Sequence, residues 1–214
     1  MSDFLWEHFF PDEPTARSLG MVEPHWIIDQ SYIMDSVKKG ACVAAVNDNG
    51  EILAVRLGVV KNRNDYLSWI FDKVFSWFFS FSIVCSFLPP SMKRTWVAIK
   101  LFKTINYDPW ATFDKLGCDR LYDDKAVCSG RFHGIRGLGT EICRRSEKLA
   151  ADLGCTHTVA AVTGVYSQRI FTKLEHTTLT SLDYDDFRDE NGELYLKDTR
   201  EHTKIITCYK KLID

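Results

Sequence analysis

The sequence predicts an α/β or α+β domain built around one β-sheet. In the second half of the chain, apolar and β-branched stretches of strand length alternate with segments of helical periodicity. A glycine-punctuated loop joins one of these strands directly to an amphipathic helix between residues 121 and 154. The chain has 214 residues, which suits one domain with a sizeable core. We therefore expect residues 1–214 to form a single domain.

Composition restricts the class of partner and the cellular compartment. Lysine and arginine total 27 against 29 aspartate and glutamate, which gives a formal net charge of −2. No basic run is interleaved with aromatic residues, so we expect no nucleic-acid partner. The seven cysteines lack CxxC spacing, so they indicate neither a disulfide framework nor a metal site. Together with the absence of a signal peptide, they favour a reducing, cytoplasmic location.

The N-terminal segment contains the first candidate functional residue. Residues 3–10 (DFLWEHFF) predict a short apolar helix, for which Ser2 is a candidate N-cap. The sequence Pro-Asp-Glu-Pro at 11–14 ends this helix, and Pro14 restricts Glu13 to an extended or turn conformation. On these residues alone, Glu13 is a solvated carboxylate at a helix end.

A β-hairpin follows. Residues 41–46 and 51–60 are apolar, β-branched runs joined by Asn-Asp-Asn-Gly. An Asn-Gly step between two such runs is a strong hairpin signal. We expect the next segment, residues 61–117, to be helical or irregular.

Residues 74–92 form an atypical, uncharged segment that is rich in aromatic residues. Serines interrupt it, and two prolines stop it after Leu88, so the pattern does not favour a transmembrane helix of about 20 apolar residues. An aromatic wall beside a ligand, a buried helix and a surface that meets a membrane or a partner all fit better.

The most informative pattern is the strand, glycine loop and helix at residues 121–154. Residues 121–128 predict the strand, and apolar spacing predicts a helix over 140–153 with Gly154 at its C-terminal end. In the loop at 134–139 (GIRGLG), Gly137 and Gly139 have no side chain that would keep a phosphate group from the helix-start amides. The loop has neither Gly-x-Gly-x-x-Gly spacing nor a P-loop lysine. It therefore indicates either a site for a phosphate-bearing cofactor or only a tight turn.

The remaining elements continue the alternation of strands and helices. We expect strands at residues 156–162, 177–184 and 203–212, a helix at 164–174 and a turn at 189–192.

The glycine loop resembles the acetyl-CoA loop of the GCN5-related N-acetyltransferases (GNAT superfamily), written Gln/Arg-x-x-Gly-x-Gly/Ala. Arg136, Gly137, Leu138, Gly139 and Thr140 match its second half. A wider resemblance to the insect-type arylalkylamine N-acetyltransferases extends over most of the chain, in the order of that family. It covers residues 8–19, the hairpin, and residues 131–154, 165–174, 182–193 and 202–212.

This resemblance implies a GNAT fold, in which a central mixed sheet is flanked by helices, and an enzyme that uses acetyl-CoA as cosubstrate. The family transfers the acetyl group directly, in a ternary complex, to a primary amine such as dopamine, tyramine, octopamine or serotonin, which would place the chain in monoamine metabolism. By the same resemblance, the catalytic residues are Glu13 as general base, Thr163 and Ser167 near the thioester sulfur, and His202 at the start of the last strand. Residues expected to bind the cofactor are Val127, Cys128, Arg136, Gly137, Leu138, Gly139, Thr140 and Ser167.

On the residues alone, simpler roles stay open for several of these positions. Thr163 and Ser167 could be helix-capping hydroxyls, and His202 a hydrogen-bonded histidine at the start of a strand. Cys128 and Cys143 are expected to be small core residues rather than nucleophiles.

Four features depart from the family pattern. The chain begins within the first helix instead of the family's first strand, and Gly134 replaces the usual Gln or Arg of the loop. The turn glycine after the last helix is replaced in the sequence Lys-Leu-Glu-His at 173–176, and Phe171 occupies the position of an acid tyrosine. An inactive or truncated paralogue that keeps the fold, an enzyme for an aliphatic amine such as agmatine, and a protein that uses the aromatic segment as an interaction surface are therefore alternatives. Contact with a membrane is the less favoured interpretation.

Overall fold

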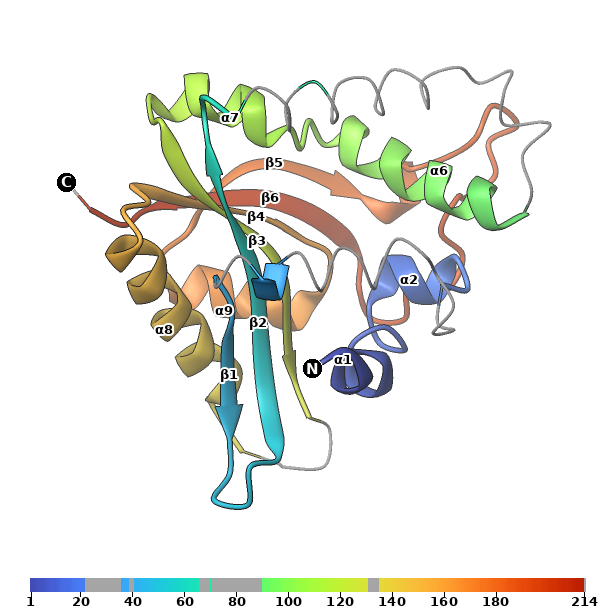
Figure 1. Ribbon diagram of the computed structural model, residues 1–214. Coiled ribbons are helices and arrows are strands. Elements are labelled where there is room, and N and C mark those ends of the chain that lie inside the picture. Colours follow the sequence, from blue (N-terminus) through green and yellow to red (C-terminus); the bar gives the residue numbers. More distant parts are fainter. Residues whose placement is uncertain (22–35, 39–40, 66–69, 71–89, 131–134, 214) are drawn as a thin grey trace.

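The computed structural model describes residues 1–21, 36–38, 41–65, 70, 90–130 and 135–213 (Figure 1). Within these ranges, six strands form one mixed sheet in the order β1-β2-β3-β4-β6-β5. Neighbouring strands are antiparallel, except for the parallel pair β3 and β4. The strands are β1 (Val43–Val46), β2 (Ile52–Asn62), β3 (Arg120–Ser129), β4 (His157–Val162), β5 (Thr177–Asp183) and β6 (Lys204–Lys211). The expected α/β fold with a central mixed sheet is confirmed.

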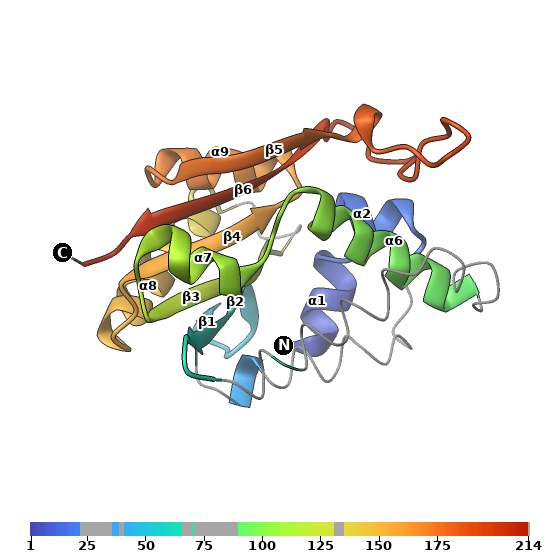
Figure 2. The ribbon, with the colours of Figure 1, turned by 90° about the horizontal axis from the view of Figure 1, so that it is seen from above.

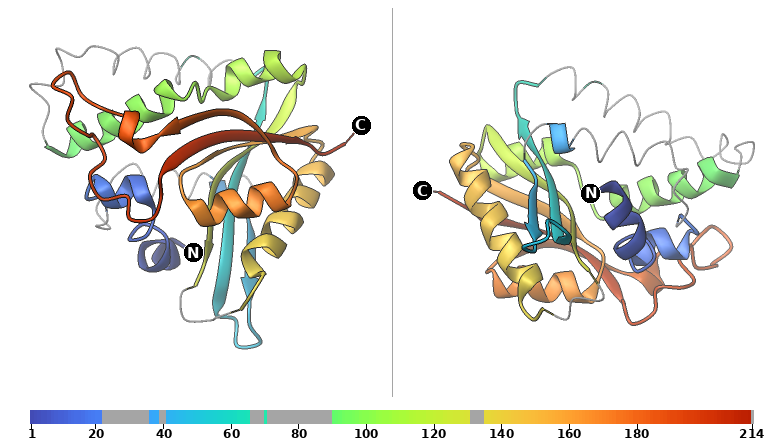
Figure 3. Two further views of the ribbon diagram at one scale, coloured as in Figure 1. Left: turned by 180° about the vertical axis from the view of Figure 1, so that it is seen from behind. Right: turned by 60° about the horizontal axis from the view of Figure 1, so that its bottom comes forward.

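Helices lie on both faces of this sheet (Figures 1 and 2). The longer ones are α6 (Pro90–Thr104), α7 (Pro109–Leu116), α8 (Leu138–Asp152) and α9 (Val165–Lys173). Two short helices, α1 (Ser2–His8) and α2 (Pro14–Ser18), come first in the chain, and no described strand precedes them. Figure 3 shows α8 and α9 together on the face that is turned away from the viewer in Figure 1.

Two adjacent residues of β3 contact helices on opposite faces of the sheet. Successive side chains of a strand point to opposite faces of the sheet. Tyr122 is fully buried toward α8, where the hydroxyl of Ser146 donates to its phenol oxygen at 2.9 Å. Leu121 points the other way and packs with Trp110 and Phe113 of α7. The sheet is therefore covered on both faces around β3.

The N-terminal helix α1 packs on the first half of β2 and on the C-terminal half of β3. Phe4 and Leu5 of α1 form one apolar cluster with Val55, Leu57 and Cys128. This cluster holds the α1–α2 unit beside the C-terminal end of β3, where the candidate site lies.

The hairpin and the central helix agree with the sequence predictions. β1 and β2 pair through Val46 and Ile52, and Gly50 in the connecting turn has φ of 81°. Gly154 follows α8 with φ of 79°, as expected of a glycine that ends a helix. The predicted N-cap is wrong: Ser2 is the first residue of α1, and the cap position is Met1, which makes no side-chain cap bond.

The segment expected to be helical or irregular contains α6 and the capped helix α7, whose individual bounds we did not predict. The Asp108 carboxylate accepts hydrogen bonds from the amides of Trp110 and Ala111 at the start of α7. Gly117, with φ of 62°, ends this helix. Residues 74–89 of the aromatic segment lie outside the described residues, and 90–92 begin α6. In the described part of the chain, we find no helix whose length and apolar character would allow it to cross a bilayer.

Candidate active site

The two parallel strands at the centre of the sheet separate toward their C-terminal ends. β3 and β4 pair from Leu121 and His157 as far as Asp124 and Ala160. Beyond this point, β3 continues along β2 as far as Ser129, while β4 continues along β6. In the described sheet, the facing edges of the two strands are therefore not joined by ladder hydrogen bonds after Asp124 and Ala160. Such edges can bind an extended ligand through their backbone groups.

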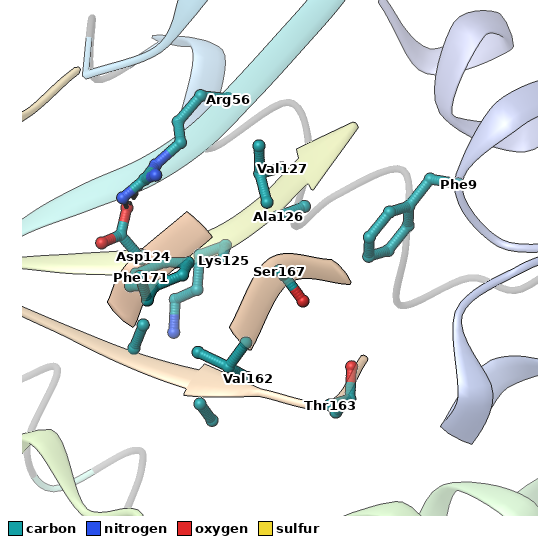
Figure 4. A pocket seen from close by; sticks show the side chains of 12 residues that line it. Phe9, Arg56, Asp124, Lys125, Ala126, Val127, Val162, Thr163, Ser167 and Phe171 are labelled. Carbon is teal, nitrogen blue, oxygen red and sulfur yellow. Dashed lines mark hydrogen bonds and ion pairs between the residues drawn. The ribbon is translucent and has the colours of Figure 1, made fainter. Parts of the chain in front are cut away.

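A pocket occupies this opening (Figure 4). Its empty volume, which is continuous with solvent, is about 380 Å³. β2, β3, β4, α9 and the residue that follows α1 all contribute to its walls. The lining side chains are those of Phe9, Arg56, Asp124, Lys125, Ala126, Val127, Ala160, Ala161, Val162, Thr163, Ser167 and Phe171.

A β-bulge in β3 lies at the wall of the pocket. Leu57 of β2 pairs with Ala126 and Gly58 pairs with Asp124, which leaves Lys125 as the extra residue. One extra residue reverses the facing of the side chains that follow it. Asp124 consequently points toward the α9 side, where it accepts from Arg56 beside Phe171, whereas Ala126 packs against the cluster of α1. Bulges are frequent beside active sites, where they redirect the strand.

One end of the pocket holds a buried ion pair, which we did not predict from the sequence. The Nε of Arg56 donates to Asp124 Oδ1 at 2.8 Å, and the hydroxyl of Thr158 donates to Oδ2 at 2.6 Å. Arg56 is only 1% exposed and lies 5.0 Å from the centre of the Phe171 ring. Burial alone would lower the pKa of Arg56, but the charge of Asp124 raises it above its usual value. Among the described residues, no acceptor reaches Arg56 Nη1. This end of the pocket is therefore a buried ion pair.

Glu13 is fixed by its role in capping α2. Its backbone is extended, with φ of −67° and ψ of 119°, as expected of a residue before proline. Its Oε2 accepts a hydrogen bond from the Ala16 amide at 2.5 Å. Oε1 is buried and has no hydrogen-bond partner among the described residues. The expectation of a solvated carboxylate is therefore wrong, because the cap holds Glu13 in one conformation and its second oxygen is buried. Glu13 is not among the residues that line the pocket.

Thr163 and Ser167 both reach the pocket from the junction of β4 and α9. The Ser167 hydroxyl donates to the Gly164 carbonyl at 2.9 Å. Figure 4 shows both hydroxyls at one end of the pocket, opposite Arg56 and Asp124. The structure therefore brings these two predicted residues together.

His202 lies behind this junction and is not among the residues that line the pocket. It is 7% exposed, and its Nδ1 accepts a hydrogen bond from the Val165 amide at 3.1 Å. The neutral ring then carries its proton on Nε2. In this position His202 supports the first turn of α9.

The residues expected to bind the cofactor fall at two places. Val127 lines the pocket, and Cys128, next to it on β3, is buried in the cluster of α1. The others form the start of α8: Arg136 is exposed, Gly137 occupies the cap position with φ of 83°, and Leu138, Gly139 and Thr140 make the first turn. A Cβ on Gly139 would lie 3.0 Å from Cδ1 of Ile170, so a larger residue there would require this side chain to shift. Gly134 lies outside the described residues.

The cysteines near the pocket have the character of core residues. Cys128 and Cys143 are both buried, as expected. Burial raises the pKa of Cys143 to about 11 and that of Cys208 to about 12. These thiols are therefore protonated near neutral pH and are poor nucleophiles.

The fold is similar to that of several solved N-acetyltransferases. Arylalkylamine N-acetyltransferase 2 from Aedes aegypti aligns over 98% of this chain and 92% of its own, with a TM-score of 0.81 and 22% identity. A polyamine N-acetyltransferase from Drosophila melanogaster that forms N-acetylagmatine aligns over 98% and 92%, with a TM-score of 0.75 and 19% identity. Mosquito arylalkylamine N-acetyltransferase-like 5b aligns over the same shares, with a TM-score of 0.76 and 18% identity.

No protein-family model matches the sequence. No match of adequate significance was found among curated proteins either. At identities of 22% and below, the similarity establishes the architecture of the chain. The chain therefore has the GNAT fold, in the form found in insect arylalkylamine N-acetyltransferases.

Proposed function

We propose that the protein is an acetyl-CoA-dependent N-acetyltransferase that acetylates a small primary amine. The observation that carries this proposal is the opening between β3 and β4, because its pocket brings together Thr163, Ser167 and backbone edges without ladder bonds. The residues expected to bind a phosphate, at the start of α8, follow β3 directly in the chain.

The residues around this opening fit acetyl-CoA. The strand edges can form backbone hydrogen bonds with the amides of its pantetheine arm, and the first-turn amides of α8 can bind its phosphates. Gly137 adopts a positive φ that other residues rarely take, and Gly139 leaves space beside Ile170. Arg136 is exposed next to these amides and can pair with a phosphate. Bound acetyl-CoA supplies the activated acyl group.

Glu13 is proposed as the general base. A primary amine has a pKa near ~10 and arrives mostly as an ammonium ion, which must lose a proton before it can attack a thioester. The buried Oε1 of Glu13 has no described partner and can accept this proton directly or through one water. Because the cap fixes Oε2, the carboxylate needs little reorganisation to do so.

The other groups are proposed to stabilise charge. A backbone amide near Val127 and Cys128 can donate to the oxyanion that forms at the carbonyl carbon. The departing thiol has a pKa of roughly 8.5, so it leaves readily as a thiolate. The hydroxyl of Thr163 can donate to its sulfur, and that of Ser167 can do so when it releases the Gly164 carbonyl. Because the thiolate leaves readily, these hydroxyls matter less than the base. His202 contributes by supporting α9.

The amine is proposed to be an arylalkylamine, as in the Aedes aegypti and mosquito proteins of the same fold. Phe9 gives the pocket an aromatic wall that suits such a substrate. Agmatine is the alternative, because the Drosophila melanogaster protein with the same fold forms N-acetylagmatine. A role in monoamine metabolism follows from the first choice. The cytoplasmic location and the single domain stay predictions from the sequence.

The test is the release of free CoA thiol from acetyl-CoA, measured with tyramine, dopamine, serotonin, agmatine and a lysine peptide. We expect release with the aromatic amines, and mass spectrometry should identify the N-acetylated product. Release with agmatine alone would select the aliphatic alternative. If no amine supports release while acetyl-CoA still raises the melting temperature, the chain is an inactive paralogue that retains donor binding, and the proposal is wrong.

A further inference from the structure

Tyr184 links two parts of the candidate site that are distant in the sequence. It opens the short 3₁₀ helix η1 (Tyr184–Asp186) that follows β5, and it is 2% exposed. Its hydroxyl donates to the carbonyl of Thr163 at 2.7 Å. The phenol therefore holds the residue at which β4 ends and the turn into α9 begins.

The apolar cluster that buries Tyr184 also includes Leu19, which directly follows α2. Burial raises the pKa of Tyr184 well above its usual value, and the negative charge of Glu13 raises it further, whereas Thr15 opposes the shift. The hydroxyl is consequently protonated at any pH used for assay and can act as a hydrogen-bond donor. Tyr184 thus joins the turn between β4 and α9, through its hydroxyl, to the apolar cluster at the end of the helix that Glu13 caps.

Side chains rather than ladder bonds fix the turn between β4 and α9. Besides the bond from Tyr184, Gln168 Nε2 donates to the Val162 carbonyl at 3.3 Å, and His202 Nδ1 accepts from the Val165 amide. Because a peptide unit is planar, the bond to the Thr163 carbonyl also sets the orientation of the Gly164 amide. The direction in which α9 starts, and with it the place of Ser167, depends on this peptide.

We propose that Tyr184 is a positioning residue, which holds the Thr163–Ser167 turn at a fixed distance from Glu13 so that base and hydroxyls act on the same reacting centre. This inference rests on the proposed function of the pocket. The hydrogen bond from Tyr184 to Thr163 would have this role whichever amine is acetylated. Displacement of a reacting group by about 1 Å can cost on the order of 10²-fold in rate.

The experiment compares two phenylalanine variants that each lose one buried phenol. Tyr184→Phe removes the donor to Thr163. Tyr122→Phe is the matched control, because its hydroxyl also donates to a backbone carbonyl, that of Ala41, at 2.6 Å, and it is equally buried. Tyr122 is not among the residues that line the pocket.

Two readouts are compared in both variants. Tyr184→Phe should lower kcat about 10- to 100-fold, with little change in the acetyl-CoA concentration needed for half-maximal thermal stabilisation. Hydrogen exchange should rise in the peptide that covers residues 163–168. Tyr122→Phe also removes the acceptor of the Ser146 hydroxyl, so it should lower the melting temperature at least as much while leaving kcat and exchange at 163–168 unchanged.

An unchanged kcat and unchanged exchange in Tyr184→Phe would overturn the inference, as would equal effects of the two variants on kcat. A wild-type protein that acetylates no amine would refute the proposed function instead. In that case hydrogen exchange still decides the matter: no increase at 163–168 would show that Tyr184 does not hold the turn, and an increase would support the positioning.

Discussion

Replacing Glu13 by glutamine separates the two roles of this side chain, which are to cap α2 and, as we propose, to accept a proton from the amine. A glutamine side chain keeps an oxygen that can accept the Ala16 amide hydrogen bond, now 2.5 Å long, so α2 should remain capped. An amide cannot accept a proton from the substrate. A positioned general base contributes on the order of 10²–10⁴ in rate. The expected fall in kcat/KM therefore corresponds to about 3–5 kcal/mol of transition-state stabilisation, at roughly 1.4 kcal/mol per tenfold.

Glu13→Ala removes the base and the cap together. It should lose the same activity and, in addition, about 1 kcal/mol of stability. For a chain of this size, that corresponds to a fall in melting temperature of roughly 2–4 °C. Asp108→Ala is the matched control, because Asp108 caps α7 in the same way, directly before a proline. It should lower the melting temperature similarly and leave turnover intact.

The assay is steady-state release of CoA thiol, combined with thermal melting with and without acetyl-CoA. We expect Glu13→Gln to retain the wild-type melting temperature and its increase with acetyl-CoA, while turnover falls by at least two orders of magnitude. Turnover of Glu13→Gln within threefold of wild type would refute the assignment of the base. A loss of turnover in Asp108→Ala as large as in Glu13→Ala would show that the effect is one of general stability.

Three further predictions concern stability. Glu175→Gly should raise the melting temperature by a few degrees, because Glu175 has φ of 62°, which costs a side-chain-bearing residue roughly 1–2 kcal/mol, partly offset by the greater freedom of glycine when unfolded. Gly58→Ala should destabilise the fold by roughly 1–3 kcal/mol in urea unfolding, since its Cβ would lie 2.1 Å from the Tyr122 ring. The stability supplied by buried neutral Cys143 and Cys208 should be complete below their usual pKa of 9.0 and should decline as pH rises toward about 11 and 12, and alanine variants should flatten this decline.

Each of these predictions has a contrary result. A lower melting temperature for Glu175→Gly would mean that contacts of this side chain outweigh its backbone strain. Wild-type unfolding of Gly58→Ala would contradict the close approach of β2 to Tyr122. Unfolding free energies that decline equally in wild-type and alanine variants above pH 9.0 would assign the alkaline loss to groups other than Cys143 and Cys208.

Much of the fold could be read from local patterns. The Asn-Gly step predicted the β1–β2 hairpin, and helical periodicity followed by Gly154 predicted α8, because these signals depend on neighbours in sequence. The bounds of helix α7 were not predicted, although Asp108, Pro109 and Gly117 supply an N-cap, a first-turn proline and a C-terminal glycine. These three residues are a local signal of both ends of the helix.

The departure at residues 173–176 was informative. The absence of the usual turn glycine there was noted in the sequence, and the structure has Glu175 in the left-handed region at that point. The backbone thus keeps the conformation of a glycine turn without the glycine. The resemblance located the missing glycine in the sequence. The structure shows that Glu175 takes a backbone conformation that is unfavourable for a residue with a side chain.

The buried ion pair could not be foreseen. Arg56 and Asp124 are 68 residues apart, and each lies in a segment that the sequence predicts only as a strand. Their meeting depends on the β2–β3 register and on the bulge at Lys125, neither of which leaves a local signal. Tyr184 was missed for a similar reason, because its bond to Thr163 joins a 3₁₀ turn to the end of another strand.

The most direct test of the account is a crystal structure of the protein with acetyl-CoA bound. We predict that the pantetheine arm lies between β3 and β4, with the thioester beside Ser167 and with Glu13 within reach of the attacking nitrogen directly or through one water. Acetyl-CoA bound outside this opening, or a thioester too far from Glu13 for one water to bridge, would contradict the account.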